Sequence, residues 1–165
     1  MSDSTPAAEN QRERLYAIEL DPKSISHSNA NIEHEREVAI FDILDGNTFS
    51  VEGRVDGPYR LHLALVEQRL QLTVGNTVQE ALVTHLLSLT PFKRIIKDYF
   101  IVCDSYYEAI RTAPPSRIQA IDMGRRGLHD EGSRVLTERL AGKITVDFDT
   151  ARRLFTLITA LHWKG

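Results

Sequence analysis

Three glycines interrupt a strongly charged stretch of this chain, between Gly124 and Gly132. The stretch reads Gly-Arg-Arg-Gly-Leu-His-Asp-Glu-Gly. In a helix each glycine costs about 1 kcal/mol relative to alanine, so helix propensity does not explain this composition. Guanidinium groups, imidazole and exposed backbone N–H groups are the donors that recognise phosphate and carboxylate groups. The glycines therefore indicate close helix packing, a break between two helices, or backbone exposed to an anionic ligand.

A continuous helix through this stretch puts one arginine in an unfavourable position. At about 100° per residue, Arg125 falls in the middle of the apolar side, and Asp122 and His129 lie along its edge. The apolar side consists of Ile118, Ile121, Leu128, Val135, Leu136 and Leu140. A charge on such a side is costly unless a carboxylate or an anionic ligand meets it. This geometry predicts either a self-satisfied buried network or a cleft wall lined with anion-binding groups.

A helix that breaks near Gly127 leads to the same kind of ligand. Asp130 would then cap a second helix, and the free N–H groups at its start would lie beside Arg125 and Arg126. A phosphate or a carboxylate suits that corner as well. The sequence leaves the continuous helix and the broken helix open.

The predicted ligand-binding residues are Asp122, Arg125, Arg126, His129 and Arg152. Arg152 is included, with its neighbour Arg153 as a further candidate, because both open the last predicted helix and could lie near Arg125. A purely structural role is the competing interpretation, since Asp122–Arg126 and Asp130–Arg134 are ordinary i,i+4 pairs that contribute only tenths of a kcal/mol. Capping, helix contact and ion pairing would then account for the whole segment.

The six histidines do not form a metal-binding pattern. His34-Glu35-Arg36-Glu37-Val38 lacks the second histidine that a zincin helix needs, and a single cysteine cannot form a cysteine-pair zinc site. That cysteine, Cys103, has aromatic neighbours on its helix face, which predicts a core residue rather than a nucleophile. No phosphate-binding loop or dinucleotide fingerprint is present. We therefore expect no metal and no cofactor.

The composition is that of an ordinary globular protein. Of the 165 residues, 42% are hydrophobic and 26% are charged, which fits one domain with a proper core. The formal charge of −3 argues against nucleic-acid binding, which would need a local basic patch. No stretch approaches the ~20 apolar residues that span a bilayer. The single cysteine and the polar first residues, which contain no apolar signal core, favour the cytoplasm.

The N-terminal part of the chain predicts a leader, a strand and a helix. Residues 1–11 are small and polar, so we expect a disordered leader followed by a single globular domain over 12–165. Alternating apolar residues predict a first strand over Leu15–Leu20. Ile32–Leu44 predicts a helix, with acidic residues near its start and a glycine just past its end.

The clearest β region runs from Tyr59 to Leu89. Apolar residues of one parity recur in it, and turns fall near Glu67-Gln68 and Gly75-Asn76. Short connections of this kind favour an antiparallel meander. Together with the first strand, this region predicts a small antiparallel sheet of about three to four strands.

Helical periodicity dominates the C-terminal half. Thr90-Pro91 suits the first turn of a helix whose apolar face continues to Ile110, and we expect this helix to cross the sheet at the centre of the core. Pro114-Pro115 ends it, a second helix covers Ser116–Leu140, and residues 151–161 carry the buried stripe of a last helix. A small sheet packed against this half, with about four helices in all, makes an α+β fold.

Several segments of the chain resemble one protein family. They are Leu89–Ile95, Lys97–Phe100, Ser105–Arg111, Ala120–His129, Val146–Ile158 and Asn31–Arg36. The resemblance extends over nearly the whole chain after the leader. The family is a small alphaproteobacterial one that is classed only as uncharacterised. The resemblance therefore implies a bacterial cytoplasmic protein and transfers no catalytic residues.

Two functions are compatible with the candidate site. We expect a non-catalytic module that binds an anionic ligand or a partner protein through Asp122–Arg126 and His129, without contact to a membrane. The alternative is an enzyme that acts on a phosphorylated or carboxylated small molecule, with His129 as general acid or base and the arginines as a clamp. The enzyme predicts a concave pocket that holds Arg125, His129 and a group from another segment, such as His85 or Arg152.

Overall fold

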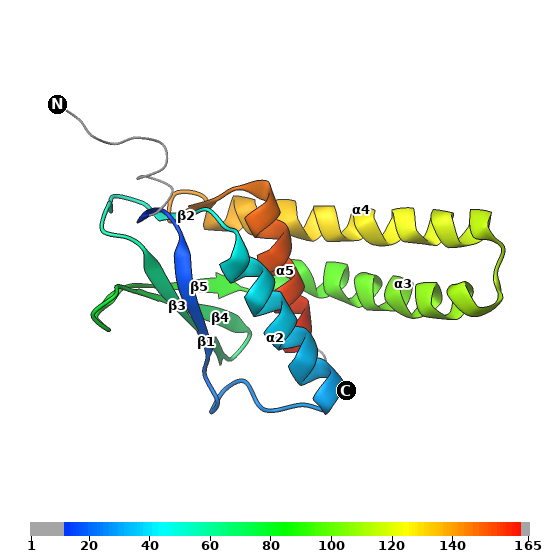
Figure 1. Ribbon diagram of the computed structural model, residues 1–165, viewed down its shortest axis with the longest axis horizontal. Coiled ribbons are helices and arrows are strands. Elements are labelled where there is room, and N and C mark those ends of the chain that lie inside the picture. Colours follow the sequence, from blue (N-terminus) through cyan, green and yellow to red (C-terminus); the bar gives the residue numbers. More distant parts are fainter. Residues whose placement is uncertain (1–11, 163–165) are drawn as a thin grey trace.

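The computed structural model describes residues 12–162 of the chain (Figure 1). The leader expected over residues 1–11 lies outside this part, as do residues 163–165. Figure 1 shows a sheet crossed by two helices and, on one side of it, a long helical hairpin that projects away from the sheet. The candidate site belongs to the region where the hairpin meets these helices.

A four-stranded sheet forms in the order β1-β3-β4-β5. Its strands are β1 (Leu15–Leu20), β3 (Tyr59–Val66), β4 (Arg69–Gly75) and β5 (Ala81–Ser88). The last three are antiparallel neighbours, which confirms the predicted meander. Since side chains alternate between the two faces of a sheet, only one face is apolar and buried, as at Leu63 and its cross-strand neighbour Leu72.

The first strand differs from the expected antiparallel sheet. β1 pairs with β3 in parallel, with Ile18 opposite Leu61. Parallel neighbours need a long crossover, and α2 (Ala30–Asp45) lies between the two strands in sequence and supplies it. The sheet is therefore mixed, within the α+β fold that the sequence predicts. Two short strands, β2 (Phe49–Val51) and β6 (Ile144–Val146), form a separate antiparallel pair that is too short to show a period.

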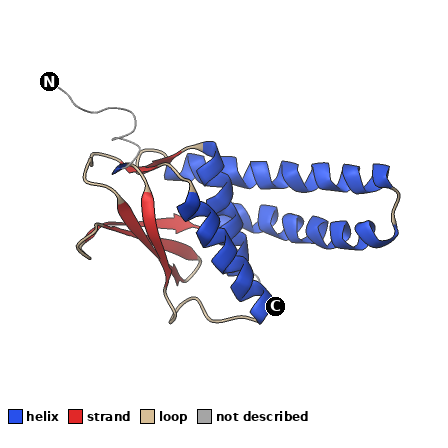
Figure 2. Ribbon diagram, in the orientation of Figure 1, coloured by secondary structure: helices blue, strands red, loops and turns tan. Residues whose placement is uncertain are grey.

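The helices gather on one side of the sheet (Figure 2). The C-terminal ones are α3 (Lys93–Thr112), α4 (Pro115–Leu140) and α5 (Phe148–His162). Thr90-Pro91 does not open α3 directly but lies in a separate 3-10 turn, η1 (Thr90–Phe92). With α2, the described residues contain the four α-helices that the sequence predicts.

α5 fills the centre of the core. Its predicted stripe is buried throughout and consists of Ala151, Leu154, Phe155, Ile158 and Leu161. The carboxylate of Asp147 caps the start of the helix, since it accepts a hydrogen bond from the N–H of Thr150 at 3.1 Å. Buried leucines of β3, β4 and α4 surround the stripe. This position makes α5 the element on which the sheet and the hairpin both depend.

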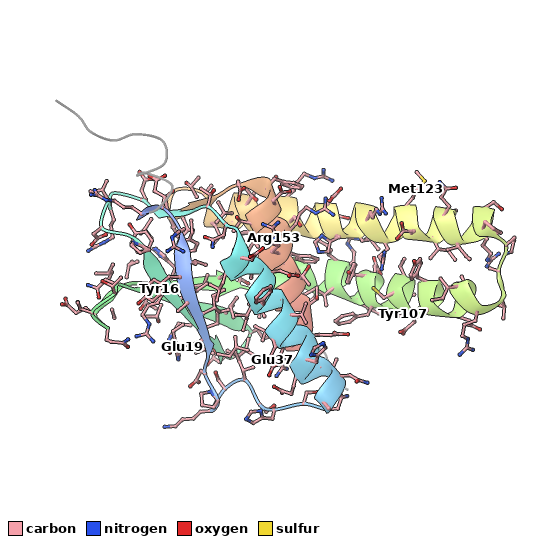
Figure 3. The ribbon with its side chains drawn as sticks, viewed as in Figure 1. Tyr16, Glu19, Glu37, Tyr107, Met123 and Arg153 are labelled. Atoms are coloured by element: carbon pink, nitrogen blue, oxygen red, sulfur yellow. The ribbon has the colours of Figure 1, made fainter. Side chains whose placement is uncertain are left out.

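α3 does not cross the sheet, which corrects the expected position of this helix. Its buried residues are Ile95, Ile96 and Ala109, whereas Tyr107 is 60% exposed. The apolar face meets α4 instead, because the chain reverses after α3 and lays the two helices side by side (Figure 1). Figure 3 places Tyr107 and Met123 on this hairpin, far from the sheet. An apolar stripe of helical period can be buried against a helix or a sheet, so the period does not identify the partner.

A buried arginine connects α2 to α5. Arg36 is 5% exposed, and its Nε donates to the carbonyl of Ala160 at 3.1 Å. Its Nη1 donates to the carbonyl of Ser26 at 3.0 Å and to the carboxylate of Glu33 at 3.1 Å. A buried guanidinium is tolerated because these acceptors meet it. Sequence reasoning does not find Arg36, since two of its three acceptors, the carbonyls of Ala160 and Ser26, lie outside its own helix.

Candidate functional site

α4 is one unbroken helix from Pro115 to Leu140, so the continuous geometry is the correct one. Arg125, the arginine on the apolar side of this helix, has two partners. Arg125 Nη2 donates to Asp122 Oδ1 at 2.5 Å, as the spacing predicts, and the guanidinium carbon lies 4.4 Å from the ring centroid of Tyr106 on α3. A carboxylate and an aromatic face together stabilise a half-buried guanidinium. Tyr106 belongs to another helix, and a helical wheel of α4 cannot predict such a contact.

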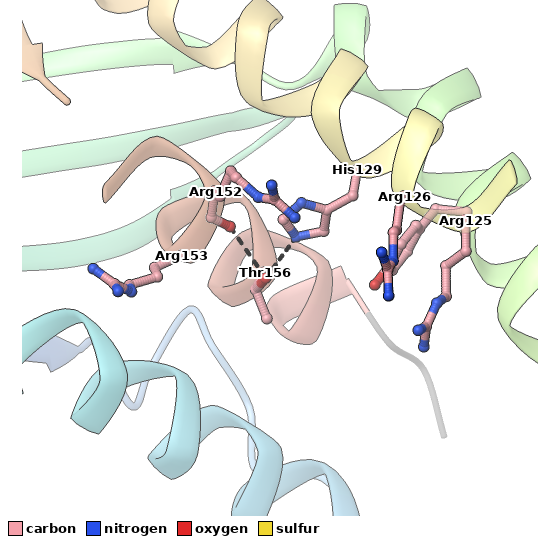
Figure 4. A pocket seen from close by; sticks show the side chains of 7 residues that line it. Arg125, Arg126, His129, Arg152, Arg153 and Thr156 are labelled. Carbon is pink, nitrogen blue, oxygen red and sulfur yellow. Dashed lines mark hydrogen bonds between the residues drawn. The ribbon is translucent and has the colours of Figure 1, made fainter. Parts of the chain in front are cut away.

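A cavity of about 370 Å³ opens between α4 and α5 (Figure 4). Its lining residues are Tyr99, Arg125, Arg126, His129, Arg152, Arg153 and Thr156. The structure thus brings four of the five predicted ligand residues to one cavity, three from α4 and one from α5. Asp122 is not part of the lining but contacts two of the arginines. His85 lies on β5 and is absent from the lining residues.

One carboxylate serves both arginines on the α4 side of the cavity. Asp122 Oδ1 accepts from Arg125, and Asp122 Oδ2 lies 3.0 Å from Arg126 Nε. The Asp122 side chain is 19% exposed, whereas that of Arg126 is 70% exposed. Two guanidinium charges therefore share one carboxylate. Arg126 is the more exposed arginine of the pair.

The α5 side has the same ratio of charges. Arg152 Nη1 lies 3.4 Å from Asp130 Oδ1, which is an ion-pair distance without the alignment of a hydrogen bond. Arg153 Nη1 donates to the backbone carbonyl of Gly46 at 2.6 Å. Among residues 12–162, no carboxylate forms an ion pair with Arg153. Two guanidinium groups again face one carboxylate.

Thr156 holds the imidazole of His129 in place. The Thr156 hydroxyl oxygen lies 2.7 Å from His129 Nε2, and the direction of this hydrogen bond follows the tautomer of the ring. The same hydroxyl lies 3.1 Å from the carbonyl of Arg152. Nδ1 of His129 is enclosed by protein and, within the described residues, has no hydrogen-bond partner.

The surroundings keep His129 uncharged near neutral pH. Burial is the largest cause that lowers its pKa below the ordinary value of 6.5, and the charge of Arg152 adds to it. Asp130 acts in the opposite direction, and Arg125 lowers the pKa further. The ring also packs against Phe155 of the core, edge to face, at a centroid distance of 5.2 Å. His129 is thus a neutral, immobilised part of the cavity wall.

The remaining wall groups are neutral as well. Burial strongly raises the pKa of Tyr99, which keeps its phenol protonated at neutral pH. Burial also raises the pKa of the half-buried Cys103 thiol beside it. A thiol of raised pKa is a poor nucleophile. The core position expected for Cys103 is wrong, because the residue is only half-buried and does not belong to the hydrophobic core. The arginines and their two carboxylates are therefore the charged groups of this site.

The three glycines of the segment differ in their surroundings. A Cβ at Gly132 would lie 2.2 Å from the ring of Phe155, so α4 and α5 approach each other there more closely than any other residue allows. A Cβ at Gly124 or Gly127 would meet nothing within 4 Å. Only Gly132 has the close-contact role that the sequence offers as one explanation of the glycines.

Two lining residues, Tyr99 and Thr156, are missing from the predicted candidates. Tyr99 belongs to the apolar pattern of α3, and Thr156 occupies a position on α5 where threonine attracts no notice. Arg153, the further candidate, does line the cavity, and the sequence points to it because it opens the last predicted helix together with Arg152. Their shared cavity depends on how α3, α4 and α5 dock, which a single sequence does not specify.

The comparisons with known proteins identify a family. The model of the Uncharacterised protein family (UPF0262) matches residues 12–164. This chain belongs to that family. A UPF0262 protein of Nitrobacter winogradskyi is 58% identical over 165 residues, which cover 100% of this chain and 99% of the relative. A UPF0262 protein of Rhodopseudomonas palustris strain TIE-1 is 56% identical over 162 residues, covering 98% of this chain and 99% of the relative. No solved structure matches the chain.

The family therefore agrees with the resemblance seen in the sequence. Two structural findings concern other classes of function. Within residues 12–162, no helix is long and apolar enough to cross a membrane. The same residues contain no group of three histidine, cysteine, aspartate or glutamate side chains that could hold a metal ion.

Proposed function

We propose that this UPF0262 protein binds a small anionic ligand in the α4–α5 cavity, in the cytoplasm and without catalysing a reaction on it. One observation carries the proposal: four guanidinium groups line one cavity, and only two carboxylates of the described residues, neither of them in the lining, pair with three of these groups. The excess of positive charge favours an anion. Arginine also offers paired N–H donors that match the oxygen atoms of phosphate and carboxylate groups.

The size of the cavity favours a small molecule as the ligand. Ligand pockets in proteins range from about 300 to 1,000 Å³, and this one has about 370 Å³. A nucleic acid would instead need an extended basic surface, and the chain as a whole is acidic, with a formal charge of −3. A concave, arginine-lined site of this size suits a metabolite with phosphate or carboxylate groups.

The position of His129 favours binding over catalysis. A general acid or base must reach the proton that it transfers. Nε2 of His129 is engaged with Thr156, and Nδ1 is enclosed by the protein. The concave pocket that the enzymatic alternative predicts is present, but neither ring nitrogen is presented to a ligand. We therefore assign His129 to the wall of the site.

The proposal is tested by titrating the protein with inorganic phosphate and pyrophosphate at constant ionic strength, in a calorimeter and by thermal unfolding. The variant Arg126→Gln/Arg152→Gln removes one exposed guanidinium from each side of the cavity. We expect wild type to bind pyrophosphate at least ~10-fold more tightly than this variant, because charge-assisted hydrogen bonds each contribute about 1.5–3 kcal/mol. Saturating ligand should also raise the unfolding temperature of wild type.

A matched control separates a specific site from general charge attraction. Arg139→Gln removes one positive charge from an exposed position on α4 outside the cavity lining. It should bind both anions as wild type does. Equal affinity of wild type and the double variant would refute the proposed site.

A further inference from the structure

The two arginine pairs come from two different helices and occupy separate parts of the cavity. Arg125 and Arg126 project from α4, and Arg152 and Arg153 project from α5 (Figure 4). Figure 4 shows His129 between the two pairs in this view. The positive charge of the site is therefore divided between two centres.

Each centre has the same net charge. On the α4 side, two guanidinium groups and Asp122 leave one positive charge. On the α5 side, two guanidinium groups leave one positive charge beside Asp130. Each centre can therefore compensate one negative charge of a ligand, and neither has the surplus to compensate both.

The wall between the centres is polar but uncharged. It contains the neutral imidazole of His129 and the hydroxyl of Thr156, which bond to each other. Tyr99 adds a protonated phenol. A charged group of a ligand would have no oppositely charged partner at this wall. An uncharged segment needs no such partner and can lie against it.

From this arrangement we infer that the ligand carries two anionic groups, one for each arginine pair, joined by a short uncharged segment that lies against His129 and Thr156. The inference rests on the proposed anion-binding function and gives it a ligand class: small bis-phosphorylated, phospho-carboxylated or dicarboxylated molecules. When one molecule engages both centres, the second contact is intramolecular and gains a high effective concentration. That gain depends on the length of the segment that joins the anionic groups.

The test is a calorimetric titration with α,ω-alkanediphosphonates, whose spacer is lengthened one methylene group at a time, and with methylphosphonate as the single-ended reference. We expect an affinity maximum at one intermediate spacer, at least ~10-fold tighter than methylphosphonate, because a spacer that matches the span maximises the effective concentration. Spacers shorter or longer than this one should bind more weakly.

Two single variants locate the ends of the ligand. Arg126→Gln weakens the α4 centre and Arg152→Gln weakens the α5 centre, both at exposed side chains. Each should remove most of the gain of the best diphosphonate over methylphosphonate. Arg139→Gln, outside the lining, should keep both the gain and the optimum spacer. Circular dichroism and unfolding without ligand verify that each variant is folded.

The outcomes separate this inference from the proposed function. Methylphosphonate binding that is lost in the double variant, combined with an affinity independent of spacer length, overturns the two-centre ligand and leaves the anion site in place. A spacer optimum that persists in both single variants also overturns it, because the ends then lie elsewhere. If neither methylphosphonate nor any diphosphonate binds more tightly to wild type than to the double variant, both proposals fail.

Discussion

The imidazole of His129 lies at a point where a change in its charge affects two helices. It projects from α4, bonds to Thr156 of α5 and packs against the buried ring of Phe155. Arg152 and Arg125 disfavour a positive charge there, and Asp130 favours one. Burial is the dominant influence and also disfavours the charged form. The folded protein therefore binds a proton at this site less readily than the unfolded chain does.

This difference predicts a pH dependence of stability. Because the pKa of His129 in the folded state lies below the ordinary value of 6.5, its stabilising effect is complete above that pH and is lost as the pH falls below it. The free energy of unfolding should therefore decrease as the pH falls below 6.5. The comparison of wild type with His129→Gln, by denaturant unfolding at several pH values, isolates this contribution.

A second histidine provides the control. Burial and Lys143 lower the pKa of His85 on β5, so His85→Gln should remove a separate part of the slope. Carboxylates with lowered pKa values, such as Asp21, act near pH 4 and below, outside this window. A constant stability difference between wild type and His129→Gln from pH 7.5 to 5 contradicts the prediction.

The sequence predicts part of the site at the level of single residues. The helical wheel places Arg125 on the apolar side with Asp122 at its edge, and the structure pairs the two at 2.5 Å. The pair is local, separated by three residues, and depends only on helix geometry. The sequence does not predict the contacts of Tyr106 with Arg125 and of Thr156 with His129, because each contact joins two different helices. The sequence thus predicts contacts within an element better than contacts between elements.

At the scale of elements, the approach of α4 to α5 shapes the cavity. Gly132 lets the two helices meet over Phe155, which is fully buried between neighbouring aromatic rings. A few residues before this contact, the arginines of α4 face those of α5 across the cavity. A wider spacing of the helices would separate the two arginine pairs. We therefore expect the contact at Gly132 to control both stability and ligand binding.

Two glycine substitutions of equal chemistry should have opposite effects. Gly132→Ala places a Cβ 2.2 Å from the ring of Phe155, so the ring or the helices must shift, at a cost of about 1–3 kcal/mol. Gly127→Ala meets nothing within 4 Å and should stabilise the helix by up to ~1 kcal/mol. Thermal unfolding measures both, at roughly 2–4 °C per kcal/mol for a chain of this size.

The same two glycine variants also test whether the helix contact at Gly132 affects ligand binding. Gly132→Ala should weaken pyrophosphate binding, and Gly127→Ala should leave it unchanged. A Gly132→Ala protein as stable as wild type would show that Phe155 has room to move, contrary to its fully buried position.

The elements themselves are predicted well where a period is long and unambiguous. The limits of β1 match the predicted strand, and α4 begins within one residue of the expected position. The direction of β1 and the partner of α3 are not predicted, because alternation and helical period describe which face is apolar but not what covers it. For α3 the covering element is α4 instead of the sheet.

At the scale of the whole molecule, the hairpin of α3 and α4 extends beyond the core (Figure 1). From residue 101 to residue 127, Ala109 is the one buried residue, whereas α5 has nine. Far from the sheet, the two helices have mainly each other as partners. Their outer turns are therefore bound less firmly than the turns that meet α5.

Hydrogen exchange should reveal this difference in local stability between the hairpin and α5. Amides of residues 101–127 should exchange faster than those of Ala151–Leu161, because local opening of the hairpin exposes little buried apolar surface. Mass spectrometry of peptic fragments after exchange measures the two regions in one experiment. Adding pyrophosphate should slow exchange around Arg125 and Arg126 more than in the outer turns of the hairpin. Equal protection of the hairpin and α5 contradicts the prediction.

The central position of α5 has a consequence for biosynthesis. The helix comes late in the chain, yet it supplies the buried stripe of the core and one of the two arginine pairs. A ribosome releases residues in sequence order, so the sheet and the hairpin are complete before their common partner emerges. Neither the core nor the proposed binding site can form until then. A polypeptide truncated before Asp147 would therefore lack both and should not bind pyrophosphate.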